Sequence, residues 1–199
     1  MKKKEKQLGP AIVQSGDAVL RLTAAPVLKK DFGSKELLAT IDLMNASLEG
    51  EFDGVAIAAP QIGISQRIFI ISRKAFAVEE EKNTKKGSAP KKPVHIPEKN
   101  IVCINPEIIK TSRKKVKVPE GCLSVRWFYG NTMRHEKATI RAYDEFGKSF
   151  TLGGTKLIAQ IFQHETDHLN GTLFIDHATE IMELSKEEIA EIEAKGAGK

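Results

Sequence analysis

The sequence predicts an α+β fold for this chain of 199 residues. One observation is a strongly periodic helical segment over Thr155–Asn170, with Thr155 as a cap and Gly171 as its end. The other is a series of short β-branched or alternating segments that are typical of strands. Short strands around one well-patterned helix are typical of α+β proteins. Because a domain commonly contains ~100–200 residues, we expect a single domain over residues 1–199.

The first predicted element is an amphipathic helix over Ser34–Leu48, whose apolar residues recur at three- and four-residue steps. Ser34 is its expected N-cap, and Gly50 follows its expected end. The segment Gly54–Gly63 is small, apolar and bounded by glycines, which predicts a buried turn or an edge strand. The β-branched segment Arg67–Ser72 predicts a strand.

Residues 74–100 contain three prolines, a triple glutamate and few large apolar side chains, which predicts a solvated loop insertion within the domain. Further along, the sequence predicts strands on either side of a turn at Asn105–Pro106, an alternating strand, and a hairpin. These strands are Ile101–Ile104, Glu107–Thr111, Lys115–Val118, and the hairpin pair Ala138–Tyr143 and Lys148–Leu152.

After the periodic helix, Thr172–Asp176 predicts a short strand. The segment Thr179–Ala194 has the pattern of a charged helix, so we expect residues 179–199 to form a C-terminal helical tail.

Composition excludes several classes of protein. No segment approaches the ~18–20 apolar residues that span a bilayer, and the start, MKKKEKQLGP, lacks the apolar region of a secretory signal. Two cysteines cannot form a disulfide framework, so we expect a reducing, cytoplasmic environment. The net charge of +5 favours anionic partners without identifying one.

The strongest chemical signal is the HExxH motif from His164 to His168. On a helix, residues four apart lie on one face, so both imidazoles can bind one metal ion while Glu165 acts as general base. The alternative is a helix that carries two solvated histidines. It is disfavoured because Leu157 and Ile161 lie on the same face, which therefore looks buried.

A catalytic metal usually has three protein ligands. A metzincin would supply a third histidine at the position of Phe174, so that class is excluded. Cys122, in the segment EGCLS, is an alternative third ligand because a thiolate suits Fe²⁺ or Zn²⁺. A lone cysteine is more often a small buried apolar residue, which is our interpretation of Cys103.

Gln61 ends the segment GVAIAAPQ. Small residues allow close backbone approach to a ligand, and the amide of Gln61 can donate a hydrogen bond to an oxyanion. A tight corner that happens to contain a glutamine is the simpler alternative.

Together, GVAIAAPQ (54–61), EGCLS (120–124) and QHETDH (163–168) resemble the three motifs of the peptide deformylase family, in the same order and at comparable spacing. Residues 16–27 also resemble the opening strand of that family. The resemblance implies short, mostly antiparallel sheets packed around a central HExxH helix, with a C-terminal helix. It also implies a cytoplasmic hydrolase that removes the formyl group from N-terminal formyl-methionine of new polypeptides and releases formate.

The resemblance implies a role for each motif residue. Glu165 takes a proton from a metal-bound water, and Gln61 and the Leu123 backbone N–H hold the oxyanion. The metal is Fe²⁺, replaceable by Ni²⁺, Co²⁺ or Zn²⁺, and its implied ligands are Cys122, His164 and His168.

The implied partner is an N-formyl-methionyl nascent peptide that pairs as an extra strand. The residues implied to bind it are Gly54, Val55, Ala56 and Gly121 along its backbone, and Leu157 and Ile161 around the methionine side chain. We expect weak ribosome contact at most, since the tail over 180–199 is acidic. We expect no membrane contact, and no sequence-specific nucleic acid, because the basic segment Lys110–Lys117 has the pattern of a solvated strand.

Three positions depart from the family pattern. Ala56 stands in place of a glycine, Arg126 in place of a common proline, and Tyr129 in place of an arginine of some relatives. Two other functions stay open. One is an HExxH metallopeptidase that cuts internal peptide bonds, and the other is a binding module for formylated N-termini without turnover.

Overall fold

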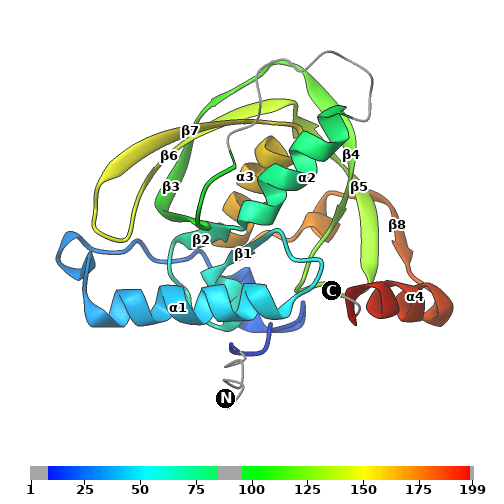
Figure 1. Cartoon of the computed structure of the whole chain (residues 1–199), viewed down its shortest axis with the longest axis horizontal. Coiled ribbons are helices and arrows are strands. Elements are labelled where there is room, and N and C mark those ends of the chain that lie inside the picture. The colour runs from blue at the N-terminus through cyan, green and yellow to red at the C-terminus, as the bar shows by residue number, and fades with distance from the viewer. Residues whose placement is uncertain (1–8, 85–95, 198–199) are drawn as a thin grey trace.

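The computed structural model describes residues 9–84 and 96–197, which form two antiparallel sheets and four α-helices (Figure 1). The larger sheet has the order β1-β2-β3-β6-β7, and the smaller has the order β4-β5-β8. The larger sheet consists of β1 (Ala56–Ala58), β2 (Ile68–Ile71), β3 (Ile101–Thr111), β6 (Lys137–Tyr143) and β7 (Ser149–Thr155). The smaller consists of β4 (Lys115–Gly121), β5 (Phe128–His135) and β8 (Thr179–Glu183).

The helices are α1 (Lys35–Gly50), α2 (Arg73–Thr84), α3 (Lys156–Leu169) and α4 (Lys186–Ala197). Four short 3-10 helices join them: η1 (Ala18–Arg21), η2 (Lys29–Asp31), η3 (Ala59–Ile62) and η4 (Phe174–Asp176). Figure 1 shows α3 at the centre, enclosed by the curved sheet, with α1 below. The α+β class, the antiparallel sheets around the HExxH helix and the C-terminal helix are confirmed.

The core is built on both faces of β2, whose four residues are all buried. Its side chains alternate between two apolar clusters, as the two-residue period of a strand requires. Phe69 and Ile71 belong to the cluster that includes Phe162 of α3, whereas Ile68 and Ile70 belong to the cluster of α1. This packing places α3 against the larger sheet.

Several predicted elements are confirmed. Ser34 caps α1 by accepting a hydrogen bond from the Leu37 N–H at 3.1 Å, although Gly50 is the last residue of the helix and not the residue after it. The segment Gly54–Gly63 contains both alternatives, since β1 is an edge strand and η3 is a buried turn. The β6–β7 hairpin forms as predicted. Past the end of α3, Gly171 has a φ of +75°.

The predicted loop over 74–100 is wrong at its start, where α2 forms. Ala75 and Phe76 are buried in the core cluster beside α3, so tertiary packing outweighs the polar composition of this segment. Residues 96–100 have no regular structure, and residues 85–95 lie outside the described part of the chain.

The predicted turn at Asn105–Pro106 is also wrong, because β3 continues through it as a bulge. Asn105 has a φ of +48°, which asparagine tolerates better than most residues. Its side chain bonds both the N–H and the C=O of Val27 at 2.9 Å. The turn signal therefore marks a bulge that anchors the N-terminal segment.

Other corrections concern the chain ends. Residues 16–27 form η1 and irregular backbone with one bridge from Ala25 to Gln66, not a strand. The predicted strand at Thr172–Asp176 is η4, in which Asp176 accepts a hydrogen bond from the Leu173 N–H. The predicted helix from Thr179 begins as β8, which pairs with β5, and becomes α4 only at Lys186. No helix in the described part of the chain is long and apolar enough to cross a membrane.

Candidate active site

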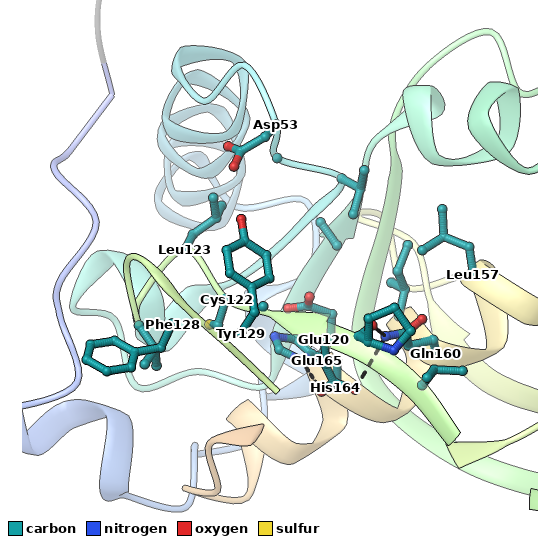
Figure 2. Close-up of a pocket in the computed structure, with 18 of the residues that line it drawn as sticks. Asp53, Glu120, Cys122, Leu123, Phe128, Tyr129, Leu157, Gln160, His164 and Glu165 are labelled. Carbon is teal, nitrogen blue, oxygen red and sulfur yellow. Dashed lines mark hydrogen bonds and ion pairs between the residues drawn. The ribbon is translucent and has the colours of Figure 1, made fainter. Parts of the chain in front are cut away.

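A cavity of about 620 Å³ lies between two strand edges and α3 (Figure 2). One edge is β1, at the border of the larger sheet, and the other is β4, at the border of the smaller sheet. Of the twelve residues implicated from the sequence, the cavity wall contains Gly54, Val55, Ala56, Gln61, Gly121, Cys122, Leu123, Leu157, Ile161, His164 and Glu165. The twelfth, His168, is buried next to Cys122.

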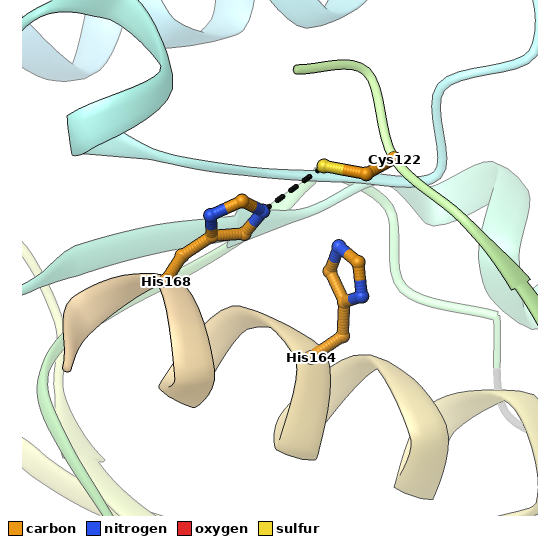
Figure 3. Close-up of side chains that lie close together, drawn as sticks. All are labelled: Cys122, His164 and His168. Atoms are coloured by element: carbon orange, nitrogen blue, oxygen red, sulfur yellow. Dashed lines mark hydrogen bonds between the residues drawn. The ribbon is translucent and has the colours of Figure 1, made fainter. Parts of the chain in front are cut away.

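Two successive turns of α3 present His164 and His168 to Cys122, which directly follows β4 (Figure 3). The Cys122 Sγ lies 3.1 Å from the His168 Nε2, and the nearest ligand atoms of all three residues lie within 4.8 Å of one another. The four-residue spacing on one helix face accounts for the paired imidazoles.

A buried carboxylate orients His164. Glu120 is 4% exposed, and its Oε1 accepts a hydrogen bond from the His164 Nδ1 at 2.6 Å. The guanidinium of Arg134, on β5, donates to both Glu120 oxygens at 2.5 and 2.9 Å. Arg134 also pairs with Asp167 at 2.7 Å, and Thr132 donates to Glu120 at 2.6 Å. With Nδ1 engaged, Nε2 is the nitrogen of His164 that can bind a metal.

Electrostatics favour the thiolate form of Cys122. Burial raises the pKa of the Cys122 thiol, but attraction to His168 and His164 outweighs burial and lowers this pKa to about 5. Burial likewise raises the pKa of the Glu120 carboxyl, yet hydrogen bonds from His164 and Arg134 hold it well below its usual range. A thiolate is therefore available at neutral pH, and the thiolate is the form that binds metal.

Glu165 occupies the wall of the cavity beside these ligands and is 3% exposed. Burial raises its pKa to about 7, against the opposing effect of His164 and His168. Its Oε2 has no hydrogen-bond partner among the described residues, although it is buried. A general base works best when its pKa lies near the working pH, so this carboxylate is suited to moving a proton.

One thiolate and two imidazoles form a donor set that suits Fe²⁺, Zn²⁺, Co²⁺ or Ni²⁺. Three protein ligands leave a position open for water or substrate, as in catalytic sites. The hydrogen bond between Glu120 and His164 is the usual outer-shell support of a metal-bound histidine. The residues therefore fit a catalytic divalent metal.

The local fold fixes the amide of Gln61. Its Oε1 accepts a hydrogen bond from the Ala58 N–H at 2.8 Å, and this contact directs Nε2 toward the ligand cluster. Nε2 donates to the Ser124 Oγ at 3.2 Å and approaches the Cys122 Sγ at 3.6 Å. The N–H that donates to the sulfur is directed at the ligand cluster, where it can instead donate to a developing negative charge.

The two strand edges leave backbone groups available to a ligand. The Val55 C=O accepts a hydrogen bond from the Ser72 N–H at 2.8 Å. In an antiparallel pair, residues alternate between bonding the neighbouring strand and facing away from it. The N–H and C=O of Ala56 therefore face the side of β1 that has no neighbouring strand. Across the cavity, Gly121 lies opposite Tyr129 on β5. A Cβ at Gly121 would lie 2.6 Å from the ring of Tyr129, so a larger residue there would force the ring to move.

Comparison with known proteins agrees with this geometry. A family model of polypeptide deformylases matches residues 10–183. The chain belongs to the polypeptide deformylase family. The resemblance found in the three motifs is therefore confirmed.

Individual deformylases are similar over most of their length. The peptide deformylase of Halothermothrix orenii is 37% identical over 168 residues, which cover 84% of this chain and 92% of that protein. A class I type b peptide deformylase from Acinetobacter baumannii has a TM-score of 0.71 at 30% identity, over 86% of this chain and 100% of that chain. A structure of the Acinetobacter enzyme with Met-Ala-Ser has a TM-score of 0.69 at 32% identity, over 85% and 99%. Like its deformylase relatives, the chain is a hydrolase that removes formyl groups from new polypeptides.

Sequence reasoning missed part of this deformylase site. The sequence around Arg134 does not indicate a role in the site, because no strand was predicted there. Arg134 reaches Glu120 only through the pairing of β4 with β5. Arg126, a departure from the family pattern, pairs with Glu51 at 2.5 Å and Asp53 at 2.7 Å. It thereby ties the loop before β1 to the loop after Cys122, at the rim of the cavity.

Glu120→Gln is expected to lower metal affinity by roughly 10- to 100-fold and the free energy of unfolding by about 3 kcal/mol. The reason is that Arg134 and His164 share the buried Glu120 carboxylate, so its loss leaves both side chains without their charged partner. Metal titration and urea denaturation measure the two effects. The matched control is Glu107→Gln, because its ion pair with Arg141 is exposed and worth less than about 1 kcal/mol. Equal, small effects of both substitutions would contradict the role of Glu120.

Proposed function

We propose that the chain hydrolyses the formyl group of N-terminal formyl-methionine in the cytoplasm, with Cys122, His164 and His168 holding one Fe²⁺ ion. The observation that carries this proposal is the clustering of the three ligand atoms within 4.8 Å of one another beside Glu165, at a cavity between two open strand edges. The same donor set also suits Ni²⁺, Co²⁺ and Zn²⁺.

A bound divalent metal would supply Lewis acidity, which would polarise the formyl carbonyl and make a water molecule acidic enough to lose a proton as it attacks. Glu165 takes the proton of the attacking water at its carboxylate and passes it to the departing amine nitrogen. The free Oε2 of Glu165 suits this exchange. Formate and a free N-terminus are the products.

The Gln61 amide and the Leu123 backbone N–H donate to the oxygen that gains negative charge during the attack. Support for Gln61 comes from its fixed orientation, since Ala58 holds its carbonyl and Ser124 its amide. The Leu123 N–H follows Cys122 directly and lies in the cavity wall. A donor that is held before substrate arrives, as the Gln61 amide is, lowers the cost of charge development.

The peptide backbone pairs with the open side of β1, beside Gly54, Val55 and Ala56, and passes Gly121 on β4. The methionine side chain enters the part of the cavity that is lined by Leu157 and Ile161. The methyl of Ala56 packs into the core cluster, so the departure from glycine leaves the backbone edge intact. Recognition by backbone suits an enzyme whose substrates differ after the first residue. A weak ribosome contact stays a prediction.

The test is formate release from formyl-Met-Ala-Ser by protein purified without oxygen and loaded with Fe²⁺ or Ni²⁺. We expect metal-dependent formate release and no cleavage of acetyl-Met-Ala-Ser. Cleavage of an internal peptide bond would instead identify a metallopeptidase. Binding of the formyl peptide without formate would identify a binding module. Either result overturns the proposal.

A further inference from the structure

The chain passes from β7 into α3 without a loop. Thr155 is the last residue of β7 and the N-cap of α3, and Lys156 begins the helix with a φ of +45°. This left-handed conformation is unfavourable for a residue other than glycine, and it persists only where surrounding contacts fix it. The helix that carries both histidine ligands therefore starts from a strained corner.

Glu79, on α2, supplies contacts that fix this corner. Its Oε1 accepts a hydrogen bond from the Thr155 Oγ1 at 2.8 Å, and its Oε2 accepts one from the Ile158 N–H at 3.1 Å. The Thr155 hydroxyl is thus directed to another helix, and Glu79 takes over the capping of the first turn of α3. A carboxylate near a helix N-terminus is also favoured by the helix dipole.

Glu79 is itself held in place. It is 5% exposed, and α2 packs beside α3 through the buried Ala75 and Phe76 (Figure 1). Glu79 lines both the active-site cavity and a second cavity of about 630 Å³ that Ile158 also lines. Glu79 therefore connects the strained corner with the wall of the active-site cavity.

We infer that Glu79 is a positioning residue for the first turn of α3. By holding this turn, Glu79 also positions Leu157, which forms part of the wall that receives the side chain of the substrate's first residue. Leu157 lies between the two residues that Glu79 contacts, and it lines the active-site cavity (Figure 2). His164 has its own support from Glu120, two turns later. Loss of Glu79 therefore weakens substrate binding more than metal binding. This inference rests on the proposed function.

The test compares Glu79→Ala, Glu79→Gln and Thr155→Val with the wild type and with Lys74→Ala, an exposed control on the same helix. For Glu79→Ala we expect KM for formyl-Met-Ala-Ser to rise roughly tenfold and kcat to change less than about twofold, because the wall moves while the reacting groups stay. Glutamine can still accept from Ile158 and donate to Thr155, so Glu79→Gln is expected to stay within about threefold of wild-type KM.

Two readouts do not depend on turnover. Metal content per chain is expected to be unchanged in Glu79→Ala, and calorimetric binding of the product peptide Met-Ala-Ser is expected to weaken as KM rises. Should Glu79→Ala fail to fold, Thr155→Val removes one of the two hydrogen bonds and is expected to raise KM and weaken product binding by about threefold.

Unchanged KM and product affinity in Glu79→Ala, or in Thr155→Val if the first variant does not fold, would overturn the inference. A parallel loss of bound metal and of kcat in Glu79→Ala would also overturn it, because that result would show that Glu79 stabilises the metal ligands. A wild type that binds Met-Ala-Ser but releases no formate from formyl-Met-Ala-Ser would instead refute the proposed function, and the product-binding comparison would still test Glu79.

Discussion

Formate release is expected to fall by roughly 10³-fold when Glu165 is replaced with alanine, because proton transfer by a positioned carboxylate contributes about 10²- to 10⁴-fold to such reactions. The carboxylate is buried beside the ligands, and its Oε2 is free to bind the attacking water. Metal content is expected to stay unchanged, since Glu165 is not one of the three clustered ligands. The measurements are kcat with formyl-Met-Ala-Ser and metal per chain by elemental analysis.

Glu49→Ala is the matched control, because Glu49 is an exposed carboxylate on α1, away from the cavity wall. It is expected to retain wild-type kcat. Activity within tenfold of wild type in Glu165→Ala would show that another group moves the proton. Loss of metal together with activity would show that Glu165 supports the ligands instead.

Cys122→Ser is expected to lower metal affinity by roughly 100-fold or more, because a neutral hydroxyl replaces a thiolate whose charge and softness suit the metal. The Cys122 pKa of about 5 means that the wild-type ligand is already ionised at pH 7. Chelator competition measures the affinity. In the Co²⁺-loaded protein, the charge-transfer absorption of a thiolate ligand is expected to disappear.

The second cysteine provides the control. Cys103 is fully buried in β3, and burial raises the pKa of its thiol far above the usual value, so it stays a neutral thiol. Cys103→Ala is expected to keep both the metal affinity and the Co²⁺ absorption, at a modest cost in stability. If the two variants lost metal equally, Cys122 would not be a ligand.

The residues of the site were predictable because each motif is local. His164 and His168 share one helix face, and the spacing that brings them together is visible in the sequence. Cys122 and Gln61 were found through motif chemistry and resemblance. Their proximity depends on where β4 ends and on the turn of η3, which the sequence alone does not give.

The parts that escaped prediction depend on contacts between distant segments. Arg134 reaches Glu120 through strand pairing, and Glu79 reaches α3 from a helix whose composition is that of a loop. β8 has five exposed residues and forms because β5 offers it an edge. Local helix and strand propensities do not depend on these distant contacts, so tertiary packing determines which elements form here.

The carboxylate network around His164 has a consequence for the order of assembly. Arg134 and Glu120 lock this imidazole as the protein folds, so the entropy of ordering the ring is lost during folding and not when the ion arrives. One of the three proposed ligands is thus preorganised before an ion arrives. We therefore expect a metal ion to enter and leave the proposed site without unfolding of the chain.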